Sequence, residues 1–238
     1  MCKMINSATK KSVIGVDARN HGESPHRDSH SYLDLASDIG QLLNKLSIPK
    51  SVILGHSMGG RTGMVFALAE PAKVSALVVV DVSPVSTPGI LNNFFPRLLH
   101  VMKSINFDGI DNLSKARALA KDKLKASGVI DHPGTMDFII MNVGVKPNKT
   151  IGWMCNIDVL KSQFGEIATF PREMDGKQYK GRTLFIGGDQ SKYIPSRDIT
   201  GIKEFFPQAD LKYVTGVGHN VHAEDPKSFL NIVTTFLS

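Results

Sequence analysis

A serine flanked by glycines is the residue of this chain that is best suited to nucleophilic chemistry. Ser57 stands at the centre of residues 55–59, Gly-His-Ser-Met-Gly, which is the spacing of a sharp turn that exposes a serine hydroxyl. The apolar run 51–54 before it predicts a buried strand, and the apolar spacing over 58–69 predicts a helix. We therefore predict that Ser57 attacks a carbonyl carbon from a strained backbone position. We expect both flanking positions to require glycine, because the strand and the helix pack closely there and a side chain would collide.

A nucleophilic serine needs a base, and His219 is the best-placed histidine. It follows the last predicted strand, 211–214, in a glycine-rich loop, and ligands of a parallel sheet bind at the carboxyl ends of its strands. There His219 would take the proton of Ser57 and return it to the leaving group. His222 is a weaker candidate because it lies nearer to a helix. His56 is predicted to face away from the nucleophile and to pack or line the pocket wall.

The acid that would orient this histidine stays open among three aspartates. Asp81 ends a predicted strand, Asp158 lies in a predicted helix, and Asp189 follows a later predicted strand. The acid must hold the imidazole tautomer and stabilise the imidazolium. We favour Asp81, then Asp158, then Asp189. The competing interpretation of Asp81 is a carboxylate that caps the turn after its strand. Ser191 could add a hydrogen bond but cannot supply the charge.

Composition and charge limit the partners. The chain has 238 residues and 42% hydrophobic content, which fits one globular domain with a substantial core. The net charge is +6, but the one basic cluster, over 115–125, has helical spacing and predicts a solvated helix face. Nucleic acid is therefore not a predicted partner. The sequence contains neither metal-ligand spacing nor a nucleotide-binding loop, so no metal and no cofactor are expected.

The compartment is predicted from what the sequence lacks. Two cysteines do not make a disulfide framework, and the chain has neither a secretory signal nor an apolar run long enough for an integral membrane segment. An intracellular protein is therefore expected.

Strands that alternate with helices predict a mostly parallel sheet covered by helices on both faces, an α/β fold. The predicted strands are 12–16, 51–54, 76–82, 183–186 and 211–214. The predicted helices are 32–46, which starts with a capping box, 58–69, 198–206 and 226–237, while residues 1–11 are expected to fray. Between about 88 and 171, helical stretches at 90–103, 113–127, 135–143 and 156–164 follow one another without a strand. We interpret residues 1–238 as one domain with an inserted helical cap.

Four motifs in register resemble the α/β-hydrolase fold. They are residues 16–25, 55–60, 80–84 and 218–219. Together they are similar to the family of alpha/beta hydrolase domain-containing protein 11 and its small bacterial esterase relatives, over nearly the whole chain. The resemblance implies a serine carboxylesterase that acts through a Ser-His-Asp triad and an acyl-enzyme intermediate. Its substrates would be small-molecule acyl esters, acylglycerols included. It implies no particular protein partner, and it implies a mitochondrial location because the animal relatives are mitochondrial.

The resemblance also assigns roles to single residues. In the bacterial relatives the acid corresponds to Asp81, with a serine at the position of Ser191, whereas in animal members the acid proposed corresponds to Asp158. The backbone N–H of Met58 corresponds to one donor of the oxyanion hole. Asn220 stands where the family usually has an aromatic residue.

Relative to this family the chain begins late. Members start with further strands and a His-Gly loop that carries the second oxyanion donor, and this sequence starts after them. We therefore expect a chain truncated at its amino terminus, with those strands missing from the sheet. The alternative function is then a catalytically impaired module that binds an acyl ligand or a partner protein.

Overall fold

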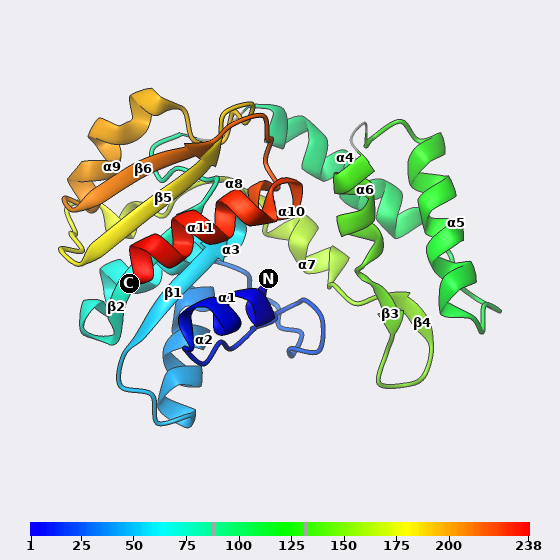
Figure 1. Cartoon of the computed structure of the whole chain (residues 1–238). Coiled ribbons are helices and arrows are strands. Elements are labelled where there is room, and N and C mark those ends of the chain that lie inside the picture. The colour runs from blue at the N-terminus through cyan, green and yellow to red at the C-terminus, as the bar shows by residue number, and fades with distance from the viewer. Residues whose placement is uncertain (87–88, 131–132) are drawn as a thin grey trace. The chain divides into compact units, whose positions relative to one another are not determined.

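The computed structural model describes residues 1–86, 89–130 and 133–238 of the chain (Figure 1). These residues form two compact units. The first comprises Met1–Val16, Ser31–Pro88 and Thr169–Ser238, and the second comprises Asp17–His30 and Gly89–Ala168. The second unit therefore consists of two insertions into the chain of the first. The larger insertion covers most of the segment in which the cap is predicted; Pro88, the predicted start of that cap, lies outside the described residues.

Four parallel strands form the sheet of the first unit, in the order β1-β2-β5-β6. They are β1 (Ser51–His56), β2 (Val74–Val80), β5 (Arg182–Gly188) and β6 (Ala209–Val214). Side chains of β2 alternate between the two faces of the sheet. Val78 and Val80 share a core cluster with Phe229 of helix α11 (Pro226–Leu237). Leu77 lies against Gly63 of helix α3 (Met58–Ala69). The predicted parallel sheet with helices on both faces is confirmed.

The other helices of the first unit follow the predicted pattern with two differences. Helix α2 (Tyr32–Lys45) begins with the predicted capping box between Ser31 and Asp34, and α9 (Ile199–Phe205) follows β5 as expected. Helix α1 (Cys2–Thr9) forms where fraying is predicted, because its Ile5 is buried and the helix packs against α11. The one-turn helix α10 (Val221–Glu224) is not predicted. Short 3₁₀ helices span Pro71–Lys73, Arg172–Met174 and Ser196–Asp198.

The strand predicted over 12–16 is wrong. These residues form irregular chain, and the side chains of Ile14 and Val16 are 51% and 49% exposed. β-branched residues favour a strand only where a neighbouring strand supplies packing and hydrogen-bond partners. Within the described residues, β1 pairs with β2 alone and no strand pairs with 12–16. The strand-like composition of residues 12–16 therefore does not produce a strand, since none of the described strands pairs with this segment.

The second unit is mainly helical and has its own hydrophobic core. Its helices are α4 (Ile90–Ser104), α5 (Leu113–Ala126), α6 (Pro133–Ile140), α7 (Ile157–Ser162) and α8 (Phe164–Ala168). The prediction that no strand interrupts them is wrong, because β3 (Val143–Val145) and β4 (Ile151–Trp153) form an antiparallel hairpin. Val143 pairs with Trp153, and both are buried. The connecting turn contains Lys149 in the left-handed region, at φ 66°.

The turn between β1 and α3 requires glycine at two positions. The sequence predicts Gly55 and Gly59, but the structure shows close approaches at Gly55 and Gly60. A Cβ atom on Gly55 would lie 2.1 Å from the carbonyl oxygen of Gly59, so the close approach predicted at this position is confirmed. A Cβ on Gly59 itself would meet nothing within 4 Å, so the prediction for that glycine is wrong. The second close approach is at Gly60, where a Cβ would lie 2.8 Å from Cγ1 of Val82.

This difference between Gly55 and Gly59 predicts opposite effects of the same substitution. Gly55→Ala is expected to lower the free energy of unfolding by about 3 kcal/mol, because the added methyl meets main-chain atoms that cannot move aside. Gly59→Ala is expected to raise it by roughly 0.5–1 kcal/mol, since alanine is the better helix former. Urea unfolding followed by circular dichroism measures both. An equal loss in the two variants would contradict the packing described for Gly55.

Candidate active site

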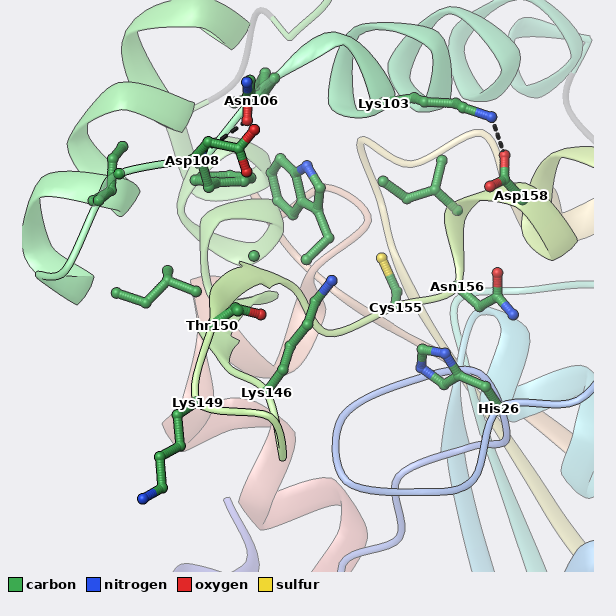
Figure 2. Close-up of a pocket in the computed structure, with 18 of the residues that line it drawn as sticks. His26, Lys103, Asn106, Asp108, Lys146, Lys149, Thr150, Cys155, Asn156 and Asp158 are labelled. Atoms are coloured by element: carbon green, nitrogen blue, oxygen red, sulfur yellow. Dashed lines mark hydrogen bonds and ion pairs between the residues drawn. The ribbon is translucent and has the colours of Figure 1, made fainter.

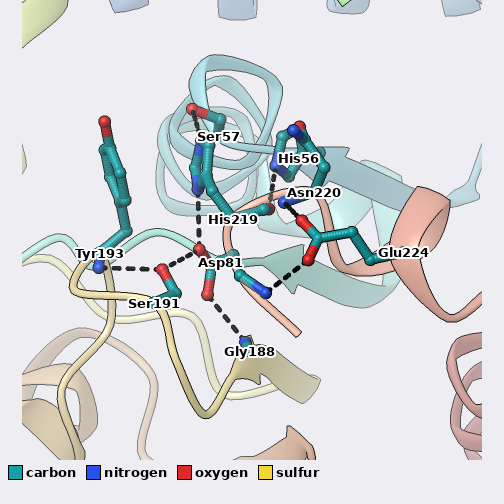
Figure 3. A network of polar contacts seen from close by, with 10 residues as sticks. His56, Ser57, Asp81, Gly188, Ser191, Tyr193, His219, Asn220 and Glu224 are labelled. Atoms are coloured by element: carbon teal, nitrogen blue, oxygen red, sulfur yellow. Dashed lines mark hydrogen bonds and ion pairs between the residues drawn. The ribbon is translucent and has the colours of Figure 1, made fainter. Parts of the chain in front are cut away.

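Ser57 occupies the turn from β1 to α3 in a strained conformation (Figure 3). Its φ is 52° and its ψ is −116°, although it is not a glycine. Such a position costs on the order of 1–3 kcal/mol and persists only where the surroundings enforce it. Here the Ser57 N–H donates to the carbonyl of Val80 at 2.9 Å, and the Ser57 carbonyl accepts from the N–H of Arg61 at 3.1 Å. The strained serine that the motif predicts is present.

Asp81 directly follows β2 and is also held in the left-handed region, at φ 50°. Its side chain is fully buried. The carboxylate accepts the N–H of Gly188 at 3.0 Å through Oδ1 and the hydroxyl of Ser191 through Oδ2. These donors compensate the cost of burying the group. The turn after β2 is capped instead by Ser83, whose hydroxyl accepts the N–H of Val85 at 3.0 Å.

His219 lies between these two residues. Its Nδ1 is 2.7 Å from Oδ2 of Asp81, and its Nε2 is 3.1 Å from Oγ of Ser57. Because an ionised carboxylate only accepts hydrogen bonds, the proton of the neutral ring belongs on Nδ1. The lone pair of Nε2 then points at the hydroxyl of Ser57. This is the arrangement of nucleophile, base and orienting acid that acyl-transfer chemistry requires.

The other two candidate acids have different partners. Asp158, on α7 of the second unit, forms an ion pair with Lys103, and the two side chains are 70% and 57% exposed. Asp189 accepts the N–H of Gly216 at 2.8 Å. Of the three aspartates that the sequence leaves open, Asp81 is the one whose carboxylate contacts His219.

His56 does more than pack. Its Nε2 donates to the main-chain carbonyl of His219 at 2.8 Å, and its ring centroid lies 4.6 Å from that of His219 and 4.9 Å from that of His222. Burial, reinforced by these two neighbouring histidines, lowers the pKa of His56 to about 3. His56 is therefore neutral at physiological pH, and its proton must lie on Nε2 because a carbonyl oxygen only accepts.

Tyr193 is a neighbour of the site that the sequence analysis missed. Its ring stacks on the imidazole of His219 with centroids 3.9 Å apart and planes 24° apart. Burial raises the pKa of Tyr193, and the carboxylate of Asp81 adds to this effect. The Tyr193 N–H donates to the hydroxyl of Ser191 at 3.2 Å, so the serine that supports Asp81 is itself held in place. The sequence signal that could have placed Tyr193 near the site was its position two residues after Ser191.

Met58 is the first residue of α3. Its N–H therefore belongs to the helix terminus where the peptide dipoles leave a partial positive charge.

Among the residues that the structure describes, no group of His, Cys, Asp and Glu side chains could hold a metal ion. None of the helices in the described ranges is long and apolar enough to cross a membrane.

The second unit contains a hollow of about 810 Å³ (Figure 2). Lys103, Asp158, His26 and Cys155 are among the residues that line it. Burial raises the pKa of Cys155 to about 11, so the thiol stays protonated at neutral pH and is a poor nucleophile. Cys155 is therefore not a second nucleophile comparable to Ser57.

The chain is similar to known hydrolases in both sequence and structure. Residues 2–110 match the family model described as alpha/beta hydrolase fold. The chain is 37% identical over 229 residues to the sn-1-specific diacylglycerol lipase ABHD11 of Xenopus tropicalis, covering 96% of this chain and 70% of that protein. It is 37% identical to the protein of the same name from Mus musculus, covering 100% and 75%. Among solved structures, a marine microorganism esterase is similar with a TM-score of 0.85 and 30% identity, covering 98% of this chain and 88% of that one.

The resemblance stated from the four sequence motifs is thus confirmed over the length of the chain. Two different kinds of likeness agree, since the sequence relatives are named lipases and the similar structure is named an esterase. The chain belongs to the α/β-hydrolase family, and within that family it is a hydrolase of the carboxylesterase and lipase type.

Proposed function

We propose that this chain hydrolyses carboxylic esters with Ser57 as nucleophile, His219 as general base and acid, and Asp81 as the residue that orients His219. The observation that carries the proposal is the continuous pair of contacts from Ser57 Oγ to His219 and from His219 to Asp81. Each contact is within hydrogen-bond reach, and each lies on the ring nitrogen that its role requires.

The reaction runs in two halves. Ser57 Oγ forms a bond to the ester carbonyl carbon while its proton passes to Nε2 of His219, and the resulting tetrahedral intermediate expels the alcohol, which takes up that proton. A water molecule then gives a proton to His219 and attacks the acyl carbon, and Ser57 leaves as the free hydroxyl. Asp81 stabilises the imidazolium that forms in each half. The N–H of Met58, at the start of α3, would donate to the developing oxyanion.

The substrate class follows from the relatives. Proteins 37% identical to this chain are named diacylglycerol lipases, so we assign acyl esters, acylglycerols included, as the class on which Ser57 acts. We propose that the helical second unit is the inserted cap of this fold. It has its own core, and its larger part is inserted between β2 and β5.

Covalent labelling tests this proposal. A fluorophosphonate probe is expected to modify the protein once, on the tryptic peptide 51–61, with fragment ions that place the adduct on Ser57 rather than on Ser51. Hydrolysis of p-nitrophenyl butyrate should fall in proportion to labelling, because both reactions need the same activated hydroxyl. A folded protein that takes up no probe, or that keeps its activity when fully labelled, would refute the assignment and favour a binding module.

A further inference from the structure

We propose that Glu224 is a positioning residue whose carboxylate holds the main chain on both sides of His219. Its Oε2 accepts the N–H of Gly218 at 2.7 Å, and its Oε1 accepts the N–H of Asn220 at 3.1 Å (Figure 3). One side chain thus binds the residue before His219 and the residue after it. The inference deepens the proposed function and rests on it, since positioning matters only if His219 is the base.

The peptide group that follows His219 is held from a third direction. Its carbonyl oxygen accepts the Nε2 proton of His56 at 2.8 Å. Because its pKa is lowered to about 3, His56 carries a single ring proton at physiological pH, and that proton is the one donated to this carbonyl. Three hydrogen bonds therefore fix the main chain at and beside His219, two of them from Glu224 and one from His56.

The local structure explains why this loop needs such a clamp. His219 lies in an irregular segment between β6 and the one-turn helix α10. Asn220 is the N-cap of α10, yet its side chain makes no capping hydrogen bond. Glu224, four residues later, reaches back with its carboxylate and satisfies main-chain donors at this end. A charged acceptor makes a stronger hydrogen bond than a neutral one, so a carboxylate suits this task better than an amide.

The other side of the loop is closed by the end of β5. A Cβ atom on Gly188 would lie 2.2 Å from the carbonyl oxygen of Gly218. The loop therefore lies directly on the main chain of Gly188, the residue whose N–H donates to Asp81. Glu224 holds the loop in the position that keeps Nε2 of His219 at 3.1 Å from Ser57 Oγ. The carboxylate itself does not touch any of the three reacting side chains in these contacts, so it acts through the main chain.

A graded pair of substitutions tests the clamp. Glu224→Gln keeps one acceptor oxygen and is expected to lower kcat for p-nitrophenyl butyrate about 10-fold, while Glu224→Ala keeps none and should lower it about 100-fold. KM should change much less, because the acyl pocket is left as it was. Asp225→Asn is the matched control. It removes the same charge one residue away, at an N-cap that accepts the N–H of Ser228 at 3.0 Å, and asparagine caps a helix as well as aspartate does.

A double-mutant cycle separates positioning from a general effect on folding. In the His219→Ala background, Glu224→Gln should have no further effect on the residual hydrolysis of p-nitrophenyl acetate, because the residue that it positions is gone. A purely structural role would instead lower the folded fraction, and hence the rate, in both backgrounds. That result, or a kcat of Glu224→Ala equal to that of Asp225→Asn, would overturn the clamp.

The native protein, assayed in the same series, distinguishes the two levels of the proposal. A folded native protein that neither hydrolyses the ester nor takes up a fluorophosphonate would overturn the proposed function and the clamp with it. An active native protein whose Glu224 variants match it in kcat would overturn the clamp alone.

Discussion

Replacing Ser57 by alanine is expected to lower kcat/KM for p-nitrophenyl butyrate about 10⁶-fold, because the acyl-enzyme can no longer form. The strained turn is held by main-chain hydrogen bonds to Val80 and Arg61, which alanine keeps. The variant should therefore unfold at nearly the same urea concentration as the native protein. Steady-state hydrolysis, with fluorophosphonate labelling of the same samples, measures the effect.

Ser51→Ala provides the control for that experiment. Ser51 begins the strand that carries Ser57, and among the described residues its buried hydroxyl has no hydrogen-bond partner. Its removal should leave both activity and labelling unchanged. If Ser57→Ala retained native turnover, the nucleophile would have to be sought elsewhere in the chain.

Asp81→Asn is expected to lower kcat about 10⁴-fold. Three donors converge on the carboxylate, from Gly188, Ser191 and His219, but an amide offers only one acceptor oxygen. Its NH₂ group must then face one of these donors. The imidazole can relieve that clash by moving its proton from Nδ1 to Nε2, and in this tautomer it cannot accept the proton of Ser57. The pH dependence of kcat and single-turnover acylation rates will show whether acylation is the affected step.

Asp158→Asn distinguishes the two acids that the sequence left foremost. This aspartate pairs with Lys103 where both side chains are more than half exposed, and such pairs contribute about 0–1 kcal/mol. We therefore expect activity and stability close to those of the native protein. A large loss of activity in Asp158→Asn with a small loss in Asp81→Asn would instead identify Asp158 as the acid that orients His219.

The sequence was most informative where a side chain and its near neighbours define the role. Ser57 sits in a local motif, and the strand and helix on either side of it could be recognised from their own residues. Asp81 could be ranked first but not separated from its rivals, because its contact with His219 spans 138 positions of sequence. His56 and Glu224 were beyond sequence reasoning for another reason. Both bind main-chain atoms of the His219 loop, and every residue carries such atoms, so no pattern marks the partner.

The fold was predictable where periodicity extends over several turns or a long apolar run. The apolar run 76–80 of β2 and the capped helix α2 are examples. The hairpin of β3 and β4 was missed because strands of three residues are too short to show an alternation. The error at residues 12–16 was the opposite one, because a strand was predicted where none forms. These residues have the composition of a strand, but no described strand pairs with them.

The distance in sequence between Ser57 and His219 has a consequence for synthesis. The two residues are 162 positions apart, and the loop that carries His219 is held by Glu224 of α10. A growing chain on the ribosome therefore displays the serine long before it can activate it, and contacts of such high sequence separation form late. Under the proposed mechanism, the hydroxyl stays inert until the loop that carries His219 has docked. Reactivity of Ser57 would thus report that the whole first unit has reached its native state, which makes covalent labelling a measure of complete folding as well as of catalysis.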